Sequence, residues 1–216
     1  MNSDNLDLAL QKLEDALTTY STNYGIEHDI EVLFLGSQSI LFHHKNINNN
    51  AIINSYEIDI IVLLGKNYKD KLEKISNHLD FAYGYGSNLH DEEMFYIDNM
   101  SDPEDEEANI RKFPKNWRSR SKTKQGEVNS KINFTFLDIH DVCILKLSAN
   151  REKDLDYVQT LIQGSILDKK TLKNCLFEMK DFIDENKTNS IKNKINYFYT
   201  LPQVNIFNSK NKFKPK

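Results

Sequence analysis

The run from Tyr56 to Leu64 is the strongest constraint on the fold, because it has the composition and length of a buried β-strand. Side chains at alternate positions of a strand share a face, so Glu57 and Asp59 point the same way, about 6.6 Å apart along the strand. The opposite face is apolar and suits a core: it carries Ile58, Ile60 and Val62. Two carboxylates beside apolar residues repel each other and resist burial, and a divalent cation would relieve both effects. The alternative is a strand edge whose polar face meets solvent.

A second strand precedes this one and ends in a Gly-Ser turn. Val32 to Leu35 is a short apolar strand, Gly36 stops it, and Ser37 can cap a helix that contains Ile40 and Leu41. A helix N-terminus offers backbone N–H groups to phosphate, and a glycine lets the backbone approach closely. The spacing therefore predicts a phosphate-binding turn next to the acidic strand. An ordinary capped strand-to-helix turn is the alternative.

The rest of the chain divides into a mixed front half and a helical back half. Apolar spacing predicts helices over 4–22 and 67–79 and a strand over 132–137, and the charged stretch 98–128 is expected to form loops or a hairpin. From Ile139 onward the pattern is helical, with later helices expected over 169–185 and 189–199. We therefore expect an α+β fold, a small mixed sheet flanked by helices with an appended helical bundle. The expected domains are 1–138 and 139–216, and the second ends in a basic tail.

Composition favours a protein of the cytoplasm. The chain has 216 residues and no apolar run near the roughly 20 residues that span a bilayer, so no membrane association is expected. The N-terminus is acidic and amphipathic, unlike a secretory signal. The two cysteines, Cys143 and Cys175, lie in apolar, helix-like stretches and are expected to be reduced core thiols.

The charges are distributed unevenly although the net charge is only −4. An acidic stretch runs from Asp98 to Glu107, and a basic stretch that includes Phe113 and Trp117 runs from Arg111 to Lys124. Cations interleaved with aromatic residues suit single-stranded nucleic acid. The favoured interpretation is a solvated loop that pairs with the acidic stretch.

The turn and the acidic strand together resemble the DNA polymerase β-like nucleotidyltransferase superfamily, whose signature is a Gly-Ser turn, a short helix and a D-x-D or E-x-D strand. The segment from His140 to Val158 resembles a later part of small bacterial members, the AbiEii-type abortive-infection toxins. In those proteins a helix carries Lys-Leu, here Lys146-Leu147, followed by an Arg and a basic-Asp run, here Arg151 and Lys153-Asp154.

The resemblance implies roles at the phosphate and metal end of the site. Gly36 and Ser37 would hold the triphosphate, and Glu57 and Asp59 would ligate Mg²⁺ or Mn²⁺. Many members have a third strand carboxylate, for which Asp138 is the candidate here.

The resemblance also implies roles for the first two helices of the helical half, which would complete the site. Lys146 would face the nucleotide phosphates as a point charge. Asp154 would orient the site or serve as a further acid, and Arg151 would bind phosphate or pair with Asp154.

These features predict a Mg²⁺-dependent enzyme that moves NMP from an NTP to a hydroxyl, either the 3′ end of an RNA such as tRNA or a protein side chain. A role as the toxin of a toxin–antitoxin pair would add an antitoxin protein as a partner. The alternative is a catalytically inactive nucleotidyltransferase-like module that binds a protein or RNA.

Overall fold

The computed structural model describes residues 3–44, 47, 57–64, 84–99 and 112–207. The predicted helix over 67–79, the Asn-rich stretch 46–54 apart from Ile47, and the basic C-terminal tail therefore lie outside the described residues, as does most of the acidic stretch.

The centre of the fold is a five-stranded mixed sheet of order β3-β2-β1-β5-β4. β1 pairs antiparallel with β2 and parallel with β5, β2 pairs parallel with β3, and β4 pairs antiparallel with β5. The strands are β1 Ile30–Phe34, β2 Glu57–Leu63, β3 Tyr96–Asn99, β4 Lys122–Gln125 and β5 Ile132–Phe136.

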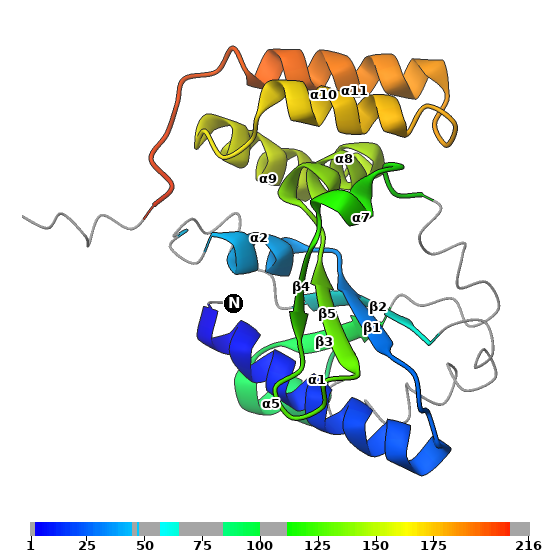
Figure 1. Cartoon of the computed structure of the whole chain (residues 1–216). Helices are drawn as coiled ribbons and strands as arrows, with labels where there is room; N and C mark the ends of the chain where they lie inside the picture. Colours follow the sequence, from blue (N-terminus) through cyan, green and yellow to red (C-terminus); the bar gives the residue numbers. More distant parts are fainter. Residues whose placement is uncertain (1–2, 45–46, 48–56, 65–83, 100–111, 208–216) are drawn as a thin grey trace, which may run out of the picture.

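Helices cover both faces of this sheet, with α1 on one side and α8 to α11 on the other (Figure 1). The described helices are α1 Ser3–Tyr24, α2 Ser37–His43, α5 Asn88–Glu93, α7 Trp117–Arg120, α8 Ile139–Ala149, α9 Glu152–Gln163, α10 Lys169–Glu178 and α11 Glu185–Phe198. None of these helices combines the length and apolar character that a membrane crossing needs.

Two apolar clusters follow from the alternation of side chains along the strands. Val32 and Ile60 face α1 and build one cluster with its leucines. Leu33 and Ile61 face the other way and join a cluster that continues through α8 to α11. The expected α+β class and the mixed sheet flanked by helices are confirmed, and this architecture is consistent with a minimal nucleotidyltransferase fold. The division of the chain at residue 138 stays a prediction.

Several element boundaries differ from the sequence prediction for local reasons. The helix predicted over 169–185 corresponds to α10, which ends at Glu178. The helix predicted over 189–199 corresponds to α11, which begins at Glu185. Asp184 sets that start, because its carboxylate accepts a hydrogen bond from the Lys187 amide as an N-cap. The stretch 98–128 includes α7 and the first strand of the β4–β5 hairpin, while α5 and β3 were not predicted.

The described part of the basic stretch pairs with acids elsewhere in the fold. Arg120 is the clearest case, because its guanidinium binds Asp141 and Glu178. Other ion pairs of the stretch join Lys115 to Asp181, Arg118 to Glu31 and Lys124 to Glu127. Phe113 and Trp117 are buried, with their ring centroids 5.2 Å apart.

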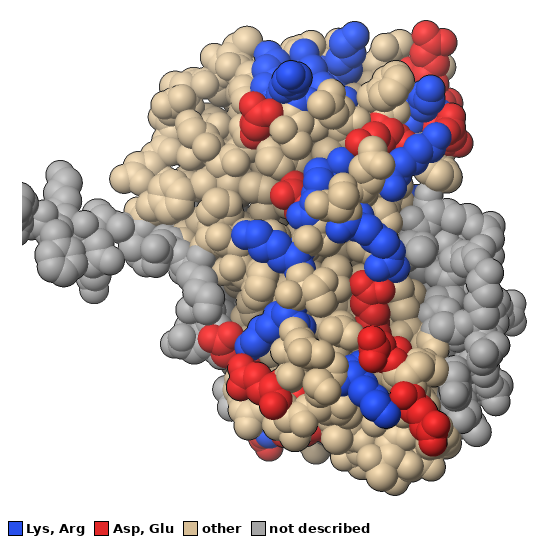
Figure 2. All heavy atoms as spheres, viewed as in Figure 1, with Lys and Arg blue, Asp and Glu red and all other residues tan. Residues whose placement is uncertain are grey.

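These contacts bear on one of the two interpretations of the basic stretch. The two aromatic rings are buried and are not exposed for stacking on bases. Pairing with the acidic stretch stays a prediction, because only Asp98 of its acidic residues is described. Acidic and basic side chains also interleave on the face shown in Figure 2. The stretch therefore stabilises the fold rather than presenting a uniform nucleic-acid surface.

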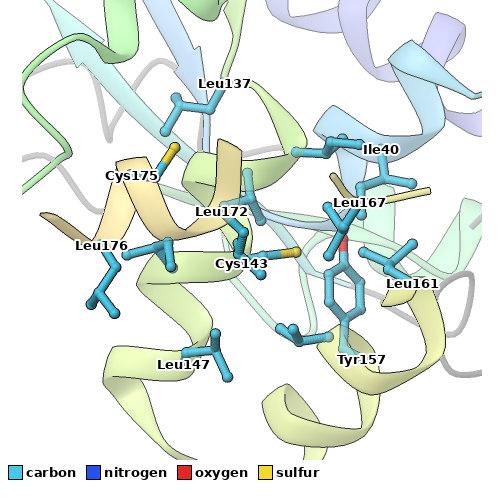
Figure 3. Packing of buried hydrophobic residues seen from close by; sticks show 14 of the residues in the cluster. Ile40, Leu137, Cys143, Leu147, Tyr157, Leu161, Leu167, Leu172, Cys175 and Leu176 are labelled. Carbon is cyan, nitrogen blue, oxygen red and sulfur yellow. The ribbon is translucent and has the colours of Figure 1, made fainter. Parts of the chain in front are cut away.

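The two cysteines are free and buried, as predicted. Cys143 from α8 lies beside Tyr157 of α9, and Cys175 of α10 lies near Leu137 (Figure 3). Burial raises the pKa of both thiols, which keeps them protonated.

Candidate active site

The acidic strand and the Gly-Ser turn meet, because antiparallel pairing places the end of β1 beside β2. The Leu35 amide donates to the Asp59 carbonyl across this pair at 3.1 Å. A Cβ at Gly36 would lie 2.6 Å from Asp59 Oδ2, so the carboxylate fills the space that a side chain at Gly36 would take. Only glycine leaves room for the Asp59 carboxylate at this turn.

Gln38 in the first turn of α2 holds this arrangement, a role that its place in the sequence does not indicate. The side chain is fully buried, and its Nε2 donates to the Glu57 carbonyl. Its Oε1 would also lie 2.6 Å from a Cβ at Gly36, and it has no hydrogen-bond partner among the described residues. Ser37 is buried at the first position of the same helix. Gln38 therefore ties the turn to β2 and leaves one buried acceptor there.

β3 adds a third carboxylate to the same face. The parallel register places Tyr96 opposite Glu57 and Asp98 opposite Asp59. The Tyr96 hydroxyl donates to Glu57 Oε1 at 2.9 Å, and burial together with this hydrogen bond raises the pKa of Tyr96 to about 12. The alternation of buried Phe95 and Ile97 with Tyr96 and Asp98 is a strand signal that could have identified Asp98.

Asp138, the candidate from the sequence, has a different position. It is the N-cap of α8, and its Oδ1 accepts from the His140 amide at 2.9 Å. Burial opposes its ionisation, but the hydrogen bonds from His140 lower the pKa of Asp138. The carboxylate beside the Glu57–Asp59 pair is therefore Asp98.

The helical half contributes a second charged group, built around Asp154. Asp154 is only 1% exposed and accepts from Lys146 Nζ at 3.0 Å and from Arg151 Nε at 2.6 Å. Burial opposes ionisation of Asp154, yet these hydrogen bonds lower its pKa. Lys146 Nζ also lies 4.6 Å from the ring centroid of Tyr157, a cation–π contact that the sequence analysis missed. The ion pair with Asp154 and the cation–π contact with Tyr157 hold Lys146 in place.

The two groups influence each other electrostatically. Burial raises the pKa of Asp59, the carboxylates of Glu57 and Asp98 raise it further, and the cations of Lys146 and Arg151 lower it. Burial and Glu57 likewise raise the pKa of Asp98. The fold thus brings Lys146 and Arg151 of the helical half close enough to Asp59, which packs against the Gly36 turn, to lower the pKa of Asp59. The result is a group of acidic side chains, Glu57, Asp59 and Asp98, that lies next to the Gly36 turn.

A family model described as "Nucleotidyltransferase of unknown function (DUF6036)" matches residues 11–204. The chain belongs to this family. No curated protein and no solved structure matches the chain. The match supports the nucleotidyltransferase superfamily and nucleotidyl transfer in general, without singling out the AbiEii-type members.

The site of this DUF6036 member offers carboxylate oxygens, the kind of donor that Mg²⁺ binds. In the parts of the chain that the structure describes, no three His, Cys, Asp or Glu side chains form a ready-made metal cage. Mg²⁺ does not need one, because it commonly binds one or two carboxylates and completes its shell with water and substrate phosphate. The donors here are carboxylate oxygens, and their mutual repulsion favours a cation. The residues present therefore fit a metal bound together with a nucleotide.

Proposed function

We propose that this protein is a Mg²⁺-dependent nucleotidyltransferase that moves NMP from an NTP to a hydroxyl acceptor. Glu57 and Asp59 would hold Mg²⁺ or Mn²⁺, and Asp98 on β3 would add negative charge beside them. When bound, the metal would stabilise the charge that develops on the transferred phosphoryl group. The observation that carries the proposal is the packing of the Asp59 carboxylate against the Gly36 turn.

The other residues would bind and orient the nucleotide. Gly36 and Ser37 would hold the triphosphate through the backbone N–H groups at the start of α2, beside the Asp59 carboxylate. Lys146 would bind the phosphates, and its ammonium is already directed by Asp154 and Tyr157. Arg151 is largely exposed and pairs with Asp154, so it could add a second cation for the nucleotide. Asp154 would act mainly as a positioning residue for Lys146 and Arg151, rather than as a direct proton donor.

The acceptor would be an RNA 3′ end, such as that of tRNA, or a protein hydroxyl. The resemblance to AbiEii-type toxins motivates a toxin role in the cytoplasm, with an antitoxin protein as partner. Growth arrest on expression, dependent on Asp59, would support that role, and growth unaffected by the active protein would argue against it.

The direct test uses Asp59→Asn, which keeps the size of the side chain and removes its charge. We expect the wild type to transfer label from an α-³²P NTP to RNA or protein in the presence of Mg²⁺. Asp59→Asn should abolish the transfer while retaining the unfolding transition. Asp156→Asn is the matched control, because Asp156 is exposed on α9. Equal activity in the Asp59 variant would refute the assignment.

The inactive binding module remains the second candidate, because an ion cluster such as that around Asp154 can also be structural and does not by itself indicate catalysis. Calorimetry with Mg²⁺ and each NTP separates the two functions. Binding without turnover across all four NTPs and total RNA would favour the module.

A further inference from the structure

A tyrosine is displayed at the outer side of the acidic cluster. Tyr85 is 81% exposed and lies between Gly84 and Gly86, both of which have positive φ. The turn is attached to β3, because the Gly84 amide donates to the Ile97 carbonyl at 3.0 Å. It is also tied to α5, since the Ser87 hydroxyl accepts from the His90 amide as an N-cap. An exposed aromatic ring is thus held on a fixed turn.

This ring belongs to an aromatic group that reaches the carboxylates. The ring centroids of Tyr85 and His90 are 4.3 Å apart, and those of His90 and Tyr96 are 5.7 Å apart. The Tyr85 and Tyr96 rings meet edge to face at 6.1 Å. The Tyr96 hydroxyl in turn donates to Glu57. We name Tyr85, His90 and Tyr96 the aromatic platform.

The position of the aromatic platform relative to the phosphate turn is informative. In the sheet order β3-β2-β1, the platform lies on the β3 side of the acidic strand and the Gly36 turn lies on its β1 side. In nucleotidyl transfer the attacking and leaving oxygens lie roughly in line on opposite sides of the phosphorus. If the triphosphate lies at Gly36, as the proposed function requires, the acceptor hydroxyl approaches from the side of the platform.

The chemistry of the platform points to a base rather than to a phosphate backbone. The segment 84–99 contains no Lys or Arg, and Asp91 and Glu92 are exposed on it. Phosphates would gain little here, whereas the face of an aromatic ring can stack on any base. Resting on the proposed function, we infer that Tyr85 stacks on the unpaired terminal base of an RNA 3′ end. The acceptor is therefore RNA rather than a protein hydroxyl.

The test measures RNA binding apart from catalysis. The probe is a single-stranded hexaribonucleotide whose 3′ base is the fluorescent analogue 2-aminopurine, titrated with full-length protein. Tyr85→Ala should weaken binding by about 5-fold to 150-fold, the range expected for one lost base–aromatic stack. Tyr85→Phe should bind within about twofold of wild type, because it keeps the ring. Tyr197→Ala is the control, since Tyr197 is also exposed but lies on α11.

Two further measurements locate the effect. With a hexaribonucleotide that is abasic at its 3′ position, wild type and Tyr85→Ala should bind equally, because no base remains to stack. Calorimetric NTP affinity should be the same in wild type and Tyr85→Ala. Binding should also depend only weakly on salt, unlike binding through many phosphates.

Several results would overturn the inference without touching the proposed function. These are equal probe affinity in Tyr85→Ala and wild type, a loss confined to NTP affinity, or label transfer to a protein hydroxyl with no probe binding. Absence of transfer by the wild type to any acceptor would instead refute the proposed function. The binding titration would still support or refute the stacking by Tyr85 in that case.

Discussion

Replacing Gly36 by alanine tests the convergence of the turn and the acidic strand more sharply than removing a carboxylate does. A Cβ at this position would lie 2.6 Å from both Asp59 Oδ2 and Gln38 Oε1, whereas ordinary contacts begin near 3.4 Å. The Asp59 carboxylate must therefore move by about 0.8 Å, the difference between these two distances. Both clashing atoms end flexible side chains, and the φ of Gly36 is an ordinary −98°, so the backbone need not change.

The expected result separates catalysis from stability. A misplacement of about 1 Å in a reacting group can lower the rate about 100-fold, so kcat for NMP transfer should fall by that order. The free energy of unfolding, measured by urea titration, should change by less than about 1 kcal/mol, because side-chain rotation relieves the clash. The assay is the initial rate of transfer from an α-labelled NTP at saturating Mg²⁺.

Gly25→Ala is a control with the opposite expectation. Gly25 follows α1 with φ +60°, and nothing lies within 4 Å of a Cβ placed there. Alanine should lower the free energy of unfolding by about 1 kcal/mol through the left-handed backbone, with kcat unchanged. Wild-type kcat and KM in Gly36→Ala would refute the argument, as would unfolding of that variant.

Two further predictions concern the ion cluster on Arg120. Arg120→Met should lower the free energy of unfolding, measured by urea titration, by about 3–5 kcal/mol, because Asp141 is fully buried and would lose its cation. Arg118→Met is the control: it removes the more exposed ion pair with Glu31 and should lower the free energy of unfolding by at most about 1 kcal/mol. Hydrogen bonds from Arg120 lower the pKa of Glu178 from 4.5 to about 2, so the stability that ionised Glu178 contributes is present above pH 4.5 and is lost as the pH falls towards 2. Burial raises the pKa of Asp141, which therefore also titrates in this pH range. Wild type and Glu178→Gln both keep Asp141, so the difference between their free energies of unfolding reports the contribution of Glu178. A difference that does not change with pH would contradict the prediction.

The sequence predicts those parts of the fold in which the spacing of apolar residues is not contradicted by another local signal. β1, β2, β5 and the start of the helical half have side-chain periods that match their burial, so their positions follow from the sequence. β3 was missed because Asp98 also begins an acidic stretch, whose composition indicates a loop. The buried residues here are Ile97 in β3 and Phe95 just before it, and they are too few to outweigh that signal.

The candidate site shows the same division. Gly36, Glu57 and Asp59 are close in sequence and joined by one strand pairing, so their convergence followed from local pattern. The contribution of Asp98 depends on which strand lies beside β2, and a parallel pairing of distant segments leaves no local signature. The roles of Gln38 and Tyr157 depend on tertiary contacts alone, since buried Gln and Tyr residues have no distinctive spacing.

The position of Lys146 near Asp59 depends on packing between the two halves of the chain. One apolar cluster contains Leu33 and Ile61 of the sheet, Ile40 of α2 and the inward-facing residues of α8 and α9. Because close-packed cores resist small displacements, this cluster fixes α8 against the sheet face that carries the carboxylates. The ammonium of Lys146 is then held by Asp154 and Tyr157 at a place from which it lowers the pKa of Asp59. The helical half therefore contributes to the site itself, because Lys146 and Arg151 supply cations that lower the pKa of Asp59 on the acidic face.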